Sequence, residues 1–147
     1  MNTKIAQFIN KQTCATVCCV DRKGNPYCFN CFYVFNSHLG LLYFKSSTST
    51  HHSGMMIDNP AVAGTILPDK LSTIQIRGVQ FNGTVLADDH PLTRQAHSHY
   101  YKKHPTALAM PGEMWAIQLN SIKMTDNTLG FGSKLNWNRE ELVNHAV

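Results

Sequence analysis

The chain has 147 residues, a length typical of one domain, and we expect residues 1–147 to fold as a single unit. Apolar residues make up 43% of it and charged residues only 15%, a composition that excludes an intrinsically disordered protein. The formal net charge of +4 contains no long run of like charges, so it permits an anionic ligand without indicating nucleic acid.

The first ten residues, MNTKIAQFIN, lack the apolar core of a signal peptide, and no segment reaches the roughly 20 apolar residues that cross a membrane. We therefore expect a cytoplasmic protein without a membrane partner. Thiols stay reduced in the cytoplasm, so the five cysteines are expected to be free. Cys28 and Cys31 form a C-x-x-C motif without a second pair, which favours core packing over metal or redox use.

The first half of the chain predicts one helix and three strands. Residues 3–12 carry apolar side chains at helical spacing. Strands are expected at 13–20, 27–35 and 41–44, and the short turns between them favour antiparallel neighbours. The first two strands are apolar nearly throughout, which indicates that both of their faces are covered, as in a barrel with helices outside.

The second half alternates helices and strands. The hydroxyl-rich stretch 46–50 precedes an amphipathic segment and predicts the start of a second helix, which ends at Asn59-Pro60. Asp89 is expected to cap a third helix that ends before Pro105. Further strands are expected at 61–67, 73–87 and 114–125.

Strands outnumber helices in this pattern, and closing the sheet removes its exposed edges. We therefore expect a mainly β (α+β) fold, a six-stranded antiparallel split β-barrel with flanking helices. Gly78 and Gly83 are expected to mark bulges or close approaches in the long strand at 73–87. The tail after residue 125 contains a turn and aromatic residues, and we do not expect it to be free coil.

The junction before the second helix is the first candidate site. Free backbone N–H groups and a partial positive charge at a helix N-terminus favour phosphate. Ser46 and Thr50 add hydroxyl donors, and His51 and His52 stand in the first turn. An ordinary capped helix in a polar loop is the alternative that local spacing alone favours.

Two further candidates lie on strands. Asn30 is the only strongly polar side chain in its apolar strand, so it needs a partner in the backbone, a neighbouring chain or a ligand. Arg77 interrupts another apolar strand, and Gly78 beside it would let a flat ligand approach the backbone. A solvated strand residue is the default alternative for Arg77.

The last candidate is the C-terminal segment. Phe131, Lys134 and Trp137 combine aromatic rings with a cation and would cover a planar anionic ligand. A closing strand packed on the barrel is the simpler alternative. No pair of acid and base side chains appears, so we assign no catalytic residue and no metal site.

Four stretches, taken in order, resemble a known family: NCFYVF (30–35), NPAVAGT (59–65), IRGVQFNG (76–83) and TDNTLGFGSKLNW (125–137). The last two are the most distinctive. Over about residues 5–140 the chain resembles the FMN-binding split barrels of the pyridoxamine 5′-phosphate oxidase-like superfamily, and within them the YhbP-like bacterial branch.

This resemblance implies an FMN site. It implies that Ser46, Thr50, His51 and His52 hold the flavin phosphate, with the two histidines replacing the usual Arg-Lys pair. It places the strand from Asn30 to Phe32 along the flavin. Two further residues, Tyr43 and Phe44, match those that enter the phosphate loop.

The resemblance also implies contacts from the second half of the chain. Arg77 and Gly78 match an Arg-Gln pair near the flavin ring, without the glutamine. Phe131, Lys134 and Trp137 belong to a segment that reaches the site from the partner subunit. The Arg-x-His pattern of the oxidase becomes Lys134-Leu135-Asn136, so pyridoxamine phosphate oxidase activity itself is not expected.

The leading hypothesis is therefore an FMN-dependent oxidoreductase with an unassigned small-molecule substrate or electron donor. We expect a homodimer with sites at its interface. A non-catalytic protein that carries flavin or haem is one alternative. A barrel that binds single-stranded nucleic acid is another, disfavoured because the strands lack interleaved Lys and Arg.

Overall fold

The computed structural model describes residues 1–130 and 132–140. Its helices are α1 (Thr3–Lys11), α2 (His51–Asp58) and α3 (Ala96–Lys103), with the short 3-10 helices η1 (Pro91–Gln95), η2 (Pro105–Ala109) and η3 (Asn127–Leu129). Its strands are β1 (Cys14–Val20), β2 (Pro26–Asn36), β3 (Leu41–Ser46), β4 (Ala61–Ile66), β5 (Arg77–Val85), β6 (Glu113–Asp126) and β7 (Lys134–Asn138).

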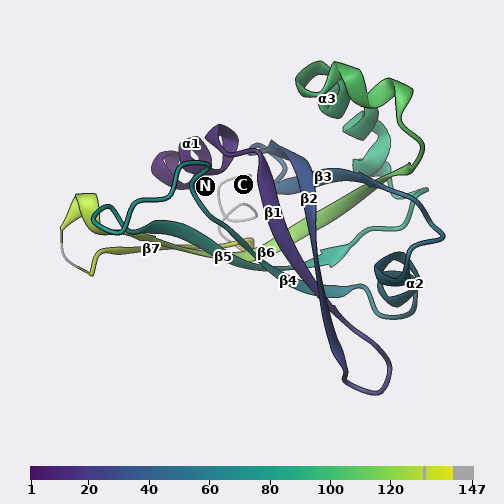
Figure 1. Cartoon of the computed structure of the whole chain (residues 1–147), viewed down its shortest axis with the longest axis horizontal. Helices are drawn as coiled ribbons and strands as arrows, with labels where there is room; N and C mark the ends of the chain where they lie inside the picture. Colours follow the sequence, from purple (N-terminus) through teal and green to yellow (C-terminus); the bar gives the residue numbers. More distant parts are fainter. Residues whose placement is uncertain (131, 141–147) are drawn as a thin grey trace.

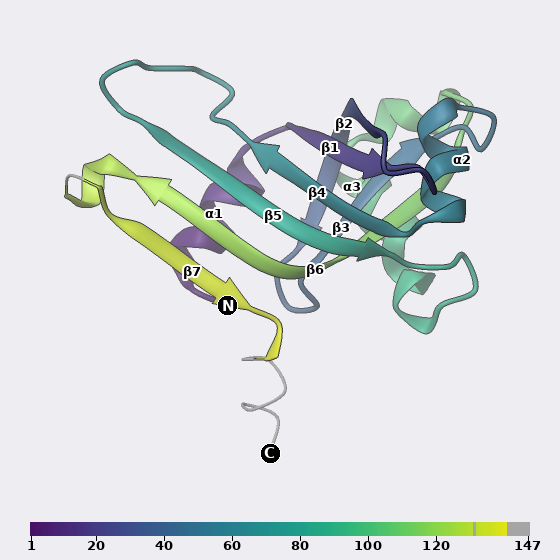
Figure 2. The same cartoon turned by 90° about the horizontal axis from the view of Figure 1, so that it is seen from below.

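The strands form one antiparallel sheet in the order β3-β2-β1-β4-β5-β6-β7, and β3 also pairs with β6. This extra pairing closes six strands into a barrel, which confirms the predicted fold class. The strand β7 lies outside the closed ring along β6 (Figure 2). Figure 1 shows the three helices at separate places around the strands.

The interior of the barrel is the main hydrophobic core. Side chains alternate between inside and outside along a strand, as the burial pattern of β4 shows. Helix α1 inserts Ile5, Phe8 and Ile9 into this core. A second cluster lies on the outside of the barrel, where Tyr100 of α3 packs against Tyr43 and Val34.

Several predicted boundaries are wrong. Residues 73–76 are not part of β5, and Ile74 is 85% exposed in the loop before it. The predicted third helix begins as η1, and His90 rather than Asp89 caps it by accepting from the N–H of Leu92. Gly83 does mark a register shift, as predicted, whereas Gly78 lies in regular pairing.

The expectation that all five cysteines are free is also wrong. Cys18 and Cys28 form a disulfide between β1 and β2, with Cα atoms 4.1 Å apart. The two residues stand directly opposite each other in the register of this strand pair. The remaining cysteines are free, as expected: Cys14, Cys19 and Cys31.

The first two strands are not covered on both faces by this chain. The outward side chains of the first half of β2 are open to solvent, and Phe32 is 63% exposed. On the inward side Tyr27 is 44% exposed, because the β1–β2 hairpin projects beyond the rest of the sheet (Figure 1). This part of the prediction is therefore wrong for the single chain.

Candidate functional site

The barrel opens where β2 and β3 diverge. Residues Pro26–Phe32 of β2 pair with β1, while only Tyr33–Asn36 pair with β3. Among the described residues, no strand pairs with the other edge of Pro26–Phe32. A pocket of about 200 Å³ lies at this opening. Its walls come from β2, the end of β3, α2 and the segment from α3 to Pro111: Phe29, Asn30, Cys31, Phe32, Lys45, Ser46, His52, Tyr100, Ala107, Met110 and Pro111.

Ser46 and His52 form the polar contact on one side of this split pocket. The Oγ atom of Ser46 lies 2.8 Å from Nε2 of His52. The imidazole stacks on Phe29, with ring centres 3.8 Å apart and planes 11° apart. Burial and then the charge of His51 lower the pKa of His52. Ser46 and His52, which were assigned to one site from the sequence, therefore lie together.

The start of α2 is capped as predicted. Thr50 Oγ1 accepts from the N–H of Ser53 at 3.3 Å and donates to the carbonyl of Ser47 at 3.0 Å. The N–H groups of His51 and His52 are the first of the helix and have no partner within it. His51 is exposed and meets the ring of Tyr27 edge-on at 5.0 Å. This end of α2 is suited to an anion.

Asn30 lies at the rim of the pocket. It is exposed, and its Oδ1 accepts from Oγ1 of Thr16 at 2.8 Å. Thr16 is its cross-strand neighbour in β1. The amide therefore has a partner inside the chain. Phe32, two residues further on, presents its ring on the same outward face.

Lys45 and Tyr100 line the pocket and were missed by sequence reasoning. Lys45 Nζ donates to the carbonyls of Ala107 at 2.8 Å and Met110 at 2.6 Å. Tyr100 Oη donates to the carbonyl of Phe32 at 3.4 Å, and burial raises the pKa of this phenol. Lys45 did carry a signal, because it is a charge in an otherwise apolar strand directly before Ser46.

Tyr43 and Phe44 do not contact the pocket with their side chains. Both are fully buried. Tyr43 packs under α3, with its hydroxyl 3.4 Å from the carbonyl of Leu92, and Phe44 stacks on Trp115 inside the barrel. A ligand contact through these side chains is therefore excluded. They hold β3 in place, which in turn positions Lys45.

Arg77 and Gly78 are not part of the split pocket of their own chain. Arg77 Nε donates to Oδ2 of Asp126 at 3.0 Å, and its guanidinium lies 5.3 Å above the ring of Phe8 in α1. Gly78 lies beside Leu67, where a Cβ would make only ordinary contacts. The structure thus gives Arg77 a structural partner that the sequence did not indicate.

Replacing Asp126 by asparagine is expected to lower the free energy of unfolding by about 2–3 kcal/mol at pH 7. Asp126 is 3% exposed and also accepts from the N–H and hydroxyl of Thr128. Burial raises its pKa, but these bonds and the charge of Arg77 outweigh that effect and leave it below the usual value.

A lowered pKa in the folded state stabilises the protein above the unfolded pKa of about 3.9, and this contribution disappears as the pH falls through the folded pKa. The loss caused by Asp126→Asn should therefore be constant from pH 5 to 8 and shrink below pH 4 in urea titrations. Asp58→Asn is the matched control, because the Arg22–Asp58 pair has the same 3.0 Å distance but is largely exposed. Equal losses of stability in Asp126→Asn and Asp58→Asn would contradict a stabilising role for the buried carboxylate of Asp126.

The C-terminal segment forms β7, which pairs with β6 outside the closed ring. Trp137 is fully buried in the main core, so its predicted contact with the partner's site is wrong. Lys134 is exposed on β7, opposite Thr125. Phe131 lies outside the described residues.

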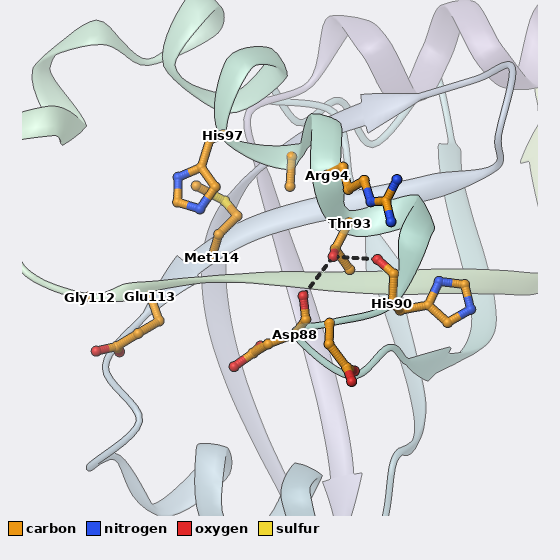
Figure 3. A pocket seen from close by; sticks show the side chains of 10 residues that line it. Asp88, His90, Thr93, Arg94, His97, Gly112, Glu113 and Met114 are labelled. Atoms are coloured by element: carbon orange, nitrogen blue, oxygen red, sulfur yellow. Dashed lines mark hydrogen bonds between the residues drawn. The ribbon is translucent and has the colours of Figure 1, made fainter.

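A larger hollow of about 560 Å³ lies between η1, α3 and the start of β6 (Figure 3). Asp88, Asp89 and Glu113 line it, with Arg94 and His97 on the helical side. The carboxylate of Glu113 also accepts from the N–H of Thr48 at 2.9 Å, in the loop before α2. Three carboxylates disfavour an anionic ligand in this hollow, so the split pocket is the better candidate.

Two features are absent from the described residues. None of their helices is long and apolar enough to cross a membrane. Within residues 1–130 and 132–140, no group of three or more His, Cys, Asp and Glu side chains is arranged to hold a metal ion.

Comparison with solved structures identifies the same fold. A haem-binding protein from Mycobacterium smegmatis superposes with a TM-score of 0.76 at 12% identity, over 93% of this chain and 57% of that one. A FAD-binding protein from Mesorhizobium loti superposes with a TM-score of 0.65 at 17% identity, over 86% of this chain and 95% of that one.

Sequence comparison identifies the family. The family model described as pyridoxamine 5′-phosphate oxidase matches residues 1–126. A UPF0306 protein from Serratia proteamaculans is 39% identical over 92% of this chain and 94% of its own length. The UPF0306 protein YhbP from Salmonella paratyphi A is 36% identical over 98% and 97%. The chain therefore belongs to the pyridoxamine 5′-phosphate oxidase-like split-barrel superfamily, in its YhbP-like branch.

Proposed function

We propose that the chain binds FMN in the split pocket and acts as an FMN-dependent oxidoreductase. The observation that carries this proposal is the convergence at one opening of a helix start, aromatic rings and polar side chains. The start of α2 offers unpaired N–H groups beside Ser46 and His52, which suits a phosphate. Phe29 and Phe32 offer rings for a planar ligand. A flavin-binding relative in fold supports the same cofactor class.

The size of the pocket supports a site shared between two chains. Pockets for drug-sized ligands commonly enclose about 300–1,000 Å³, and the split pocket encloses about 200 Å³. One chain therefore provides part of a flavin site. A second copy placed over the open side would supply the remaining surface.

The outer face of β1, β2 and β4 is suited to such a contact. The register places only small, amide or apolar side chains on it, without a charge: Cys14, Thr16, Cys18, Val20, Pro26, Cys28, Asn30, Phe32, Ala61, Ala63 and Thr65. Depletion of charge is typical of the core of protein interfaces. Asn30 and Phe32 belong both to this face and to the pocket, so a symmetric dimer would bring the two pockets to its interface.

In this proposal FMN supplies the hydride or electron chemistry when it is bound. The side chains of the pocket bind and orient it. Phe29 holds the imidazole of His52 by stacking, and Ser46 holds its Nε2 atom. Tyr100, donating to Phe32, and Lys45, donating to Ala107 and Met110, tie α3 and the segment after it to β2 and β3. The pocket of the described chain is lined by no carboxylate that would act as an acid or base.

Fluorescence titration tests the cofactor. FMN emission should be quenched at micromolar protein and saturate at roughly one FMN per chain, and absence of saturable quenching would reject the proposal. Light scattering in the presence of FMN should give the mass of a dimer, and a monomer mass would reject the shared site. Oxidation of a reduced nicotinamide by the FMN complex would support the assignment as an oxidoreductase.

A carrier of haem or flavin is the second candidate. The haem-binding protein from Mycobacterium smegmatis, with the higher TM-score of the two structures described, favours it. Titration with haem and with FMN, followed by absorption, separates the two ligands. FMN binding without nicotinamide turnover would favour a carrier over an oxidoreductase.

FMN affinity is expected to fall as the pH rises from 6.5 to 8.5. A phosphate with a second pKa of about 6 keeps its charge over this range, whereas a histidine with an ordinary pKa of about 6.5 loses its own. Burial lowers the pKa of His52, so less of the charge on this imidazole is available to a phosphate over this range. Dissociation constants of wild type, His51→Ala and His52→Ala at both pH values test this. An unchanged pH dependence in both variants would show that backbone N–H groups hold the phosphate.

A further inference from the structure

Lys45 brings a positive charge into the split pocket. Its strand lies beside α3 and η2, and its Nζ atom is held by the carbonyls of Ala107 and Met110. The ring of Tyr101 lies 5.2 Å from the same atom. An ammonium group has three donors, and two of them are used by these carbonyls. One donor is left for a ligand.

Within residues 1–130 and 132–140, no carboxylate forms an ion pair with Lys45. The two ion pairs among the described residues use Arg22 and Arg77. No Asp or Glu from the described part of the chain lines the split pocket. Glu113, which pairs with Ser46 across β3 and β6, directs its Oε2 to the N–H of Thr48. Carbonyls orient an ammonium group but leave its net charge in place, and a partly buried net charge attracts the opposite sign.

We infer that Lys45 binds an anionic oxygen of the ligand, such as a phosphate or a carboxylate, in the split pocket. This inference rests on the proposed site, and it adds the ligand class: a planar ring against Phe29 and Phe32 with an anionic group at Lys45. The phosphate of FMN and the propionates of haem share this chemistry.

The competing explanation is a purely structural lysine. The carbonyls of Ala107 and Met110 lie at the C-terminal end of η2, where a cation caps a helix favourably. A cap of this kind would hold the pocket wall in place for every ligand alike. An anion-binding lysine would discriminate between ligands that differ only in charge. The test therefore compares two ligands with the same ring.

The experiment measures the affinities of wild type and three variants for FMN and for riboflavin, which lacks the phosphate. Lys45→Met keeps the stem and removes the charge, Lys45→Arg keeps the charge, and Lys123→Met is a control at an exposed position of β6. We expect Lys45→Met to weaken FMN binding about 10- to 100-fold, the range for a hydrogen bond to a charged group. Riboflavin binding should change less than about twofold. Lys45→Arg and Lys123→Met should bind FMN within about threefold of wild type.

Equal losses for both flavins in Lys45→Met would overturn the inference in favour of the structural lysine. An unchanged FMN affinity would overturn it as well. A second measurement does not depend on flavin: inorganic phosphate, against chloride at equal ionic strength, should raise the melting temperature of wild type more than that of Lys45→Met, since the general stabilisation by phosphate is common to both proteins. If wild type binds no flavin yet shows this difference, the proposed function fails and the anion site stands. If neither flavin nor phosphate affects wild type, the proposed function and the inference about Lys45 both fail.

Discussion

Replacing Trp137 by alanine is expected to lower the free energy of unfolding by about 3–5 kcal/mol. The indole is fully buried in the main core although it comes from β7, the strand outside the closed ring. Arg139 covers the ring at 5.7 Å and ties the end of β7 to the carbonyls of Leu119 and Gly40 at 2.6 Å each. Urea unfolding measures the loss, and the melting temperature should fall by about 10 °C.

Trp137→Phe provides the matched comparison. Within the described residues the buried indole N–H has no acceptor, so phenylalanine removes an unsatisfied donor and keeps an aromatic ring. We expect the free energy of unfolding to fall much less in Trp137→Phe than in Trp137→Ala. Lys134→Ala, on the exposed face of the same strand, should change stability by less than about 0.5 kcal/mol. A folded, fully stable Trp137→Ala protein would show that β7 contributes little to the core.

Replacing Gly64 by valine is expected to cost at least about 2–3 kcal/mol. A Cβ atom at Gly64 would lie 2.3 Å from Cζ of Phe81 and 2.5 Å from the carbonyl oxygen of Thr16. The second atom is backbone, so β1 and β4 would have to separate. Chemical denaturation should show a lower midpoint with an unchanged slope.

Gly54→Ala is the control, because it is expected to raise stability where Gly64→Val lowers it. Gly54 lies in α2, and a Cβ atom added there would face open space, with no atom of a neighbouring element within 4 Å. Alanine is the better helix former, so this change is expected to stabilise the protein by about 0.5–1 kcal/mol. A neutral Gly64→Val variant would contradict the close packing of β1, β4 and β5.

Most strands could be predicted because their signal is local. Alternating or continuous apolar residues, bounded by turns, located β1 to β4 and β6 within two residues of their observed bounds. The same signal misled at residues 73–76, where apolar side chains continue into a loop and Ile74 is exposed. The strand β7 and the burial of Trp137 depend on pairing with β6, which local periodicity does not contain.

The candidate site likewise combines residues whose proximity the sequence predicts with residues that only tertiary packing brings together. Ser46, Thr50 and His52 follow one another across a strand end and a helix start, so their proximity could be read along the chain. Lys45 and Tyr100 line the same pocket only because α3 and η2 pack beside β3, more than 50 residues later in the sequence. The disulfide between Cys18 and Cys28 likewise depends on the hairpin register, which spacing alone does not determine.

The closing of the barrel has a consequence for the rate of folding. The pairing of β3 with β6 joins Leu41 to Gln118, positions 77 residues apart in the chain. Proteins dominated by such distant pairings lose much chain entropy before the contacts form, and they fold in milliseconds to seconds. Hairpins such as β1–β2 form in about 1–10 μs. Mutations at the β3–β6 seam should therefore slow folding if this pairing forms in the transition state, and otherwise speed unfolding.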